Sequence, residues 1–266
     1  MNAEPTATGT RRPADRPEFY VGYLPVPMRL RRWLRRLIPL LAGTLLIIAV
    51  LWSGSFRSPG RAVWNTRELR ELTGLAVARP YAMVRVADAT APGGVRSVLL
   101  VQEGKRGAAD LLAELDGKPV RARGHILQRD TQQLLELVPG GLMAIDALPV
   151  ADTRRLHDIT AEPIGAVTLR GEIIDPKCYL GAMKPGEGRT HKECAILCIT
   201  GGIPPMFVTY DPSGRRSYYL LTGPNGGPAD PGIRPFVADP VEVRGHASRL
   251  GDLTLLVVRP DDFSRL

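Results

Sequence analysis

Residues 117–138, GKPVRARGHILQRDTQQLLELV, align with residues 238–258, ADPVEVRGHASRLGDLTLLVV. Each stretch starts with Pro-Val, alternates apolar and polar residues through Arg-Gly-His, and ends in a second apolar run after a polar turn. Alternation with a period of two is typical of a half-buried β-strand, and the polar turn predicts a hairpin. The chain therefore contains the same β-rich unit twice.

Further strands are expected upstream of each hairpin. The predicted segments are strands 81–89 and 96–104 with a helix at 108–118 in the first copy, and strands 165–175, 205–211 and 217–223 in the second. A glycine inside a strand suits the bend of a small barrel. Three strands, a helix and two strands resemble the order of the OB-fold.

The predicted fold class is mainly β, with two tandem OB-like small barrels that carry short helices. We place the first barrel at 57–150, a linker at 151–164 and the second barrel at 165–266. One larger β-sandwich is the alternative. The 28 glycines and 24 prolines agree with an architecture rich in turns.

A single transmembrane helix is predicted before the barrels. Residues 37–56 are uncharged, and twenty residues of helix span about 30 Å, the thickness of the bilayer core. The basic tail 1–36 holds a net charge of +5 out of +8, so the positive-inside rule places the N-terminus in the cytoplasm. We expect a single-pass protein of a bacterial inner membrane, with its C-terminal domains periplasmic or otherwise extracytoplasmic.

The export signal has more than one interpretation. No A-x-A-like site follows the apolar run, which favours an uncleaved signal anchor over a cleaved signal peptide. Residues 31–34, RRWL, also fit a twin-arginine signal. The lipid bilayer is one expected partner, and residues 19–36, which include aromatic side chains before the basic run, are a candidate contact for a membrane-protein partner.

Nucleic acid is not an expected partner. The basic charge is concentrated beside the membrane segment, and the second barrel offers only Arg215, Arg216, Tyr218 and Tyr219 as a basic and aromatic surface. No Ser-His-Asp pattern, phosphate-binding loop or carboxylate pair stands out either. The sequence therefore favours a binding protein over a hydrolase or a nucleotide-dependent enzyme.

The candidate site lies in residues 171–207, GEIIDPKCYLGAMKPGEGRTHKECAILCITGGIPPMF, which contain every cysteine of the chain. We expect this segment to replace the short TAPGG connection (90–94) of the first barrel. Thr190 and Glu193 have the spacing of a capping box, and Gly201-Gly202 would end the helix. A short helix over 191–200 is therefore predicted.

On such a helix His191, Cys194 and Cys198 share one face, and Cys178 would fold over it. Three thiolates and an imidazole form a four-coordinate set that suits zinc, copper or an iron–sulfur centre. Met183 could add a thioether and favour copper. Asp175 and Lys177 could orient a ligand or lower the pKa of a thiol.

Two other interpretations remain open. Cysteines outside the cytoplasm are usually paired, so Cys178 could form a structural disulfide with Cys194 or Cys198 in a non-catalytic scaffold or interaction module. A free thiol that attacks such a bridge would instead make a thiol–disulfide redox protein. The odd number of cysteines, and a histidine on the same helix face as two of them, favour the metal-binding interpretation.

Residues 165–260 resemble small secreted bacterial domains of unknown function, which share a D-x-K-C … H-x2-C-A-x2-C motif followed by G-G-I-P-P. The matching residues here are Gly171, Asp175, Lys177, Cys178, His191, Cys194, Ala195 and Cys198. The resemblance implies an OB-like barrel that carries the site, and it implies no reaction. The anchor, the first barrel and the insertion GAMKPGEGRT are additions, which suggest a component of a membrane redox, metal-handling or assembly complex.

Overall fold

The computed structural model describes residues 22, 25–55 and 62–266. It contains two compact units, Met1–Ser58 and Pro59–Leu266. Most of the predicted tail, Phe56 of the predicted membrane span and residues 57–61 of the predicted first barrel lie outside the described residues.

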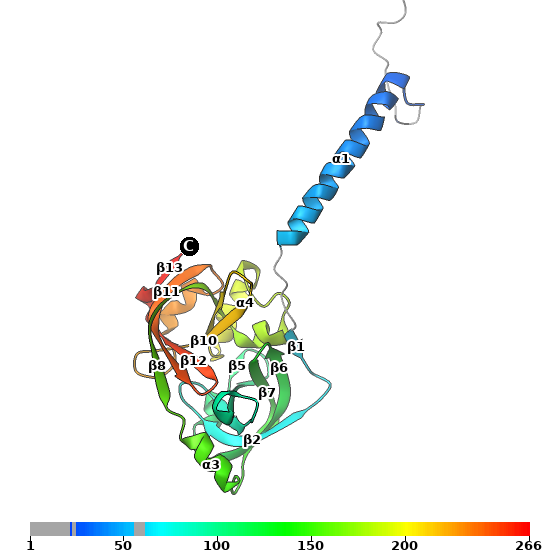
Figure 1. Cartoon of the computed structure of the whole chain (residues 1–266). Helices are drawn as coiled ribbons and strands as arrows, with labels where there is room; N and C mark the ends of the chain where they lie inside the picture. The colour runs from blue at the N-terminus through cyan, green and yellow to red at the C-terminus, as the bar shows by residue number, and fades with distance from the viewer. Residues whose placement is uncertain (1–21, 23–24, 56–61) are drawn as a thin grey trace, which may run out of the picture. The chain divides into compact units, whose positions relative to one another are not determined.

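Helix α1, Met28–Ser55, is blue in Figure 1. Among the described residues it is the one helix long and apolar enough to cross a membrane, which fits a membrane anchor or a signal sequence. It begins earlier than the predicted span, because the Arg31 N–H donates to Pro27 O at 2.8 Å and starts the helix there. The basic run before residue 37 therefore forms the first turns of α1.

The rest of the described chain is mainly β. The first sheet contains β1 (Ala62–Trp64), β2 (Arg70–Val77), β3 (Met83–Ala87), β4 (Val95–Gln102), β5 (Arg106–Gly107), β6 (Pro119–Arg129) and β7 (Gln132–Ala144). Strands β2, β3, β4, β7 and β6 pair in that order, and β6 pairs back with β2. These pairings close a five-stranded ring, and a short helix α2 (Ala109–Leu112) precedes β6.

The second sheet repeats this order. It contains β8 (Ala161–Ile174), β9 (Met206–Tyr210), β10 (Arg216–Thr222), β11 (Val241–Leu250), β12 (Leu253–Val257) and β13 (Phe263–Arg265). Strands β8, β9, β10, β12 and β11 form the ring, and the 3-10 turn η5 (Pro231–Phe236) precedes β11. In both rings the third strand pairs in parallel with the last.

Matching glycines show why the two rings have the same shape. A Cβ atom on Gly74 of β2 would lie 2.0 Å from Arg85 O, and one on Gly171 of β8 would lie 2.0 Å from Val208 O. Both glycines therefore permit the first strand to approach the second where the ring curves. The Arg-Gly-His glycines, Gly124 and Gly245, face the last strand in the same way.

The predicted linker 151–164 contains most of helix α3 (Val150–His157) and the start of β8, and Leu156 of α3 is buried with Leu75 in a small core. The prediction that the cysteine segment replaces TAPGG was wrong, because TAPGG joins β3 to β4. The counterpart of the cysteine segment is the short connection 78–82, since β2 was not predicted and is the true first strand.

Each ring has its own buried apolar cluster, and a further cluster joins the two rings. A single cluster of buried residues includes Met83, Leu99 and Leu134 of the first ring and Met206, Val208 and Leu220 of the second. Cys178 and Cys198 belong to the same cluster. The cysteine segment therefore packs between the rings, where apolar burial supplies most of the stabilisation.

Candidate metal centre

The three cysteines meet, as the sequence predicted. Cys178 begins the helical turn η3 (Cys178–Ala182) after β8, and Cys194 and Cys198 lie on α4 (Lys192–Thr200). Their sulfur atoms all lie within 4.8 Å of one another, and no disulfide joins them. Cys178 and Cys198 are buried, whereas Cys194 is partly exposed.

Helix α4 starts differently from the prediction. The 3-10 turn η4 (Arg189–His191) leads into it, and its N-cap is His191 with no side-chain capping bond. Thr190 is already part of the turn, so the predicted capping box does not form. The predicted end is confirmed, because Gly201 caps the helix and the Gly202 N–H donates to Ile199 O.

His191 is close to the thiols but is held by a carboxylate. Its Nε2 lies 3.0 Å from Asp175 Oδ2, and both side chains are buried. Asp175, Cys178 and His191 form a second group of potential ligands within 4.8 Å, so Cys178 is common to both groups. Asp175 also accepts a hydrogen bond from the Cys178 N–H at 2.9 Å, which orients that cysteine and the imidazole together.

The lysine beside the thiols is Lys105, from the first ring. Its Nζ lies 2.7 Å from Cys194 Sγ and 3.7 Å from Cys198 Sγ. It reaches them because the Gly107 N–H donates to Gly201 O, which joins β5, directly after Lys105, to the end of α4. No sequence signal marked Lys105, because its contact arises only when the two rings pack together.

Lys177 has a different place from the predicted one. Its Nζ forms a buried ion pair with Glu136 of β7 at 2.8 Å and donates to the carbonyls of Gln102 and Gly104. It therefore holds the chain just before Lys105 and does not contact the thiols. Met183 is 44% exposed, and a thioether ligand from it stays a prediction.

The pKa values of Cys178 and Cys198 shift in opposite directions. A hydrogen bond to Cys198, together with burial, raises the pKa of Cys178. Accepting that bond, with Lys105 nearby, lowers the pKa of Cys198. The contact with Cys194 raises the pKa of Lys105, so the lysine stays charged beside developing thiolates.

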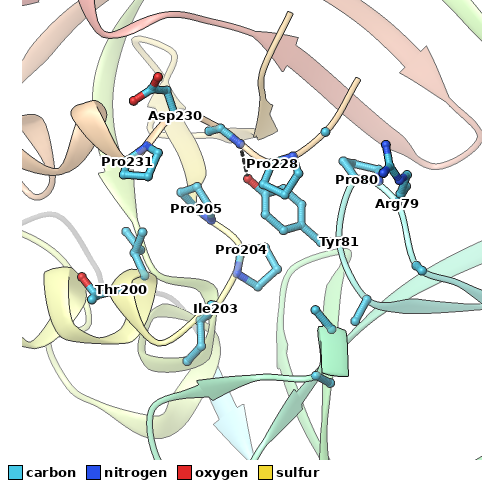
Figure 2. Close-up of a pocket in the computed structure, with 18 of the residues that line it drawn as sticks. Arg79, Pro80, Tyr81, Thr200, Ile203, Pro204, Pro205, Pro228, Asp230 and Pro231 are labelled. Atoms are coloured by element: carbon cyan, nitrogen blue, oxygen red, sulfur yellow. Dashed lines mark hydrogen bonds between the residues drawn. The ribbon is translucent and has the colours of Figure 1, made fainter. Parts of the chain in front are cut away.

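A separate cleft of about 750 Å³ lies between the rings. Figure 2 shows its proline-rich wall and Tyr81, whose hydroxyl accepts a hydrogen bond from the Ala229 N–H. Ile199 and Thr200, at the end of α4, also line it, but no cysteine does. The cleft and the thiol cluster therefore lie at different positions around the same helix.

Comparison of the chain with models of known protein families, with curated proteins and with solved structures gives no match. The geometry of the site therefore carries the functional argument. Cys178, Cys194 and Cys198 form one group that could hold a metal ion, and Asp175, Cys178 and His191 form a second.

Proposed function

We propose that this chain is a single-pass, membrane-anchored envelope protein that binds one soft metal ion at the thiol cluster. The proposal includes two OB-like barrels, since both rings follow the strand order of that fold with a helical turn before the fourth strand. Cys178, Cys194 and Cys198 are the proposed ligands, and His191 is the fourth where the ion requires four.

The separation of the sulfur atoms carries this proposal. Cys178 Sγ and Cys194 Sγ lie 3.9 Å apart. Two sulfurs that each lie about 2.3 Å from one tetrahedral zinc ion are about 3.8 Å apart. A disulfide would need a separation of about 2.05 Å. The cluster therefore has the dimensions of a site for a single ion.

The supporting residues suit a soft ion of low charge. Thiolates favour Cu(I), Zn(II) or iron–sulfur centres, and the cysteines of a [4Fe–4S] cluster each bind a different iron atom, which spreads their sulfurs further apart. Lys105 offsets part of the thiolate charge. The Asp175–His191 pair has the form of a carboxylate that orients a metal-binding imidazole.

The proposed setting is a membrane redox, metal-handling or assembly complex. The basic residues of α1 before the apolar run support an N-terminus in the cytoplasm and the barrels outside it. Residues 19–36 are the proposed contact for a membrane-protein partner. The alternative is a scaffold or redox protein in which Cys178 and Cys194 oxidise to a disulfide.

Metal content and thiol content, measured on one sample, test the proposal. The full chain is purified from membranes in detergent without oxygen, then analysed by elemental mass spectrometry and thiol titration. We expect one equivalent of copper or zinc, three cysteines without a disulfide, and loss of the metal in Cys178→Ser and Cys198→Ser. His246→Ala is the matched control, because His246 is exposed on β11.

Retention of metal in His191→Ala would indicate three-coordinate Cu(I), and its loss a four-coordinate ion. A metal-free chain with one disulfide and one free thiol would overturn the proposal in favour of the scaffold.

A further inference from the structure

The contact between Lys105 and Cys194 is too short for a hydrogen bond to sulfur. A separation of 2.7 Å is usual between nitrogen and oxygen, but sulfur has the larger radius, so an N–H···S contact is longer. The neighbouring contact from the same Nζ to Cys198 Sγ, at 3.7 Å, has the normal length. The Lys105–Cys194 separation matches instead a nitrogen and a sulfur that are bonded to one bent oxygen atom.

The surrounding backbone holds this pair in place. The Gly107 N–H donates to Gly201 O at 2.8 Å, and a Cβ atom on Gly201 would lie 1.8 Å from Lys105 O. Lys177 fixes the carbonyls of Gln102 and Gly104 on the other side of Lys105. The two reactive atoms are therefore brought together before any oxidant arrives, which lowers the entropic cost of joining them.

Cys194 is the most accessible of the three thiols, as its oxidation would require. Lys105 is exposed and Cys194 is partly exposed, whereas Cys178 and Cys198 are buried. Oxidation of a cysteine requires that the oxidant can reach its sulfur. Cys194 is therefore the sulfur that a small oxidant reaches first, and the nearest nitrogen to it belongs to Lys105.

We propose that Lys105 and Cys194 form a reversible N–O–S bridge when dioxygen reaches the site. The charged amine and the thiolate react with one dioxygen molecule to give Lys–NH–O–S–Cys and one water molecule. The O=O bond and two N–H bonds break, N–O and O–S bonds form, and the two released protons leave on the water. Dioxygen takes four electrons, two from nitrogen and two from sulfur. Two equivalents of a dithiol return them and release the bridging oxygen as water.

This modification has a consequence for the proposed metal site. The bridge uses Cys194 as well as Lys105, so the ion would lose one thiolate and the bridge would exclude it. The bridge itself does not depend on metal binding. The cluster would then hold an ion when reduced and remain closed to it when oxidised.

Peptide mass spectrometry tests the bridge directly. The full chain is purified from membranes in air, digested without reductant and compared with a sample treated with dithiothreitol. We expect a cross-linked pair of peptides containing Lys105 and Cys194, about 14 Da heavier than their sum because one oxygen is gained and two hydrogens are lost. Dithiothreitol should abolish it, as should Lys105→Arg, which keeps the charge, whereas Cys178→Ser should retain it.

Other outcomes overturn the bridge. A cross-link about 2 Da lighter than the sum would identify a direct N–S bond, and a Cys178–Cys194 disulfide would identify ordinary thiol oxidation. Complete alkylation of Cys194 by iodoacetamide in the air-purified protein would exclude any modification. Metal content, measured on the sample kept free of oxygen, shows separately whether the proposed metal site survives either result.

Discussion

The two rings share a strand order but differ in the connection after their first strand. In the first ring residues 78–82 join β2 to β3, and in the second residues 175–205 join β8 to β9. The long connection carries all three cysteines, His191 and Asp175. The ring itself is kept, and the chemistry enters as an insertion at one loop, where long insertions are tolerated.

The comparison also shows how the first ring adapts to hold the insertion. By register within each hairpin, Glu136 lies opposite His125, and its counterpart Val257 lies opposite His246. Glu136 is buried and pairs with Lys177 from the insertion. The first ring therefore provides a buried carboxylate at a position where the second ring has an apolar side chain, and it also supplies Lys105.

Breaking the ion pair between Lys177 and Glu136 should have the largest effect on stability. Lys177→Met leaves Glu136 charged and buried without a partner and frees two carbonyls, so we expect a loss of about 3–5 kcal/mol in the free energy of unfolding. Urea unfolding of the detergent-solubilised chain measures this. The double variant Lys177→Met/Glu136→Val restores the residue type of the second ring and should recover most of the loss. No recovery would show that Lys177 acts through the carbonyls alone.

The matching glycines test whether the rings are equivalent. Gly74→Ala and Gly171→Ala should each cost about 2–3 kcal/mol, because the new methyl group meets a carbonyl oxygen of the neighbouring strand. Thermal unfolding measures both, and the exposed Thr73→Ala is the control for the first ring. A large effect at one glycine and none at the other would contradict the shared geometry.

The ion pair and the matching glycines show how much of the fold and the candidate site the sequence could predict. The Arg-Gly-His hairpins and the approach of the three cysteines followed from alternation, helical spacing and the glycines that end α4. Strand β2 was missed, although the glycine of LTGLAV (72–77) matches that of LRGEII (169–174) and could have revealed it.

Lys105 and Glu136 could not be found in this way. Each is far from the cysteines in the sequence, and its contact depends on how two separate rings pack. The absent capping box has a local cause, since the chain already turns at Arg189–His191 before α4 begins.

A smaller effect is expected on the pH dependence of stability, through the contact between Glu172 of β8 and Gly188 of the long connection. Burial raises the pKa of Glu172 to about 7, although the Gly188 N–H donates to it. Because the unfolded chain ionises near 4.5, this group stabilises the fold fully at low pH. That contribution is lost as pH rises from about 4.5 through about 7. Glu172→Gln keeps the acceptor oxygen and should remove this slope, which urea unfolding at pH 5 and pH 8 can measure. A steeper slope in the variant would contradict the assignment.

The smallest effect concerns the short connection, which reaches across the rings in the opposite direction from Lys177. The Tyr81 hydroxyl donates to Leu221 O at 2.9 Å and accepts from the Ala229 N–H at 2.8 Å. Tyr81→Phe removes both bonds beside the cleft (Figure 2), where water can replace part of them. We expect a loss of about 1 kcal/mol in the free energy of unfolding. Tyr219→Phe is the matched control, because the Tyr219 hydroxyl has no hydrogen-bond partner among the described residues. An equal loss in both variants would mean that the Tyr81 contacts do not join the rings. A loss confined to Tyr81→Phe would show that the short connection, like the long one, helps to hold them together.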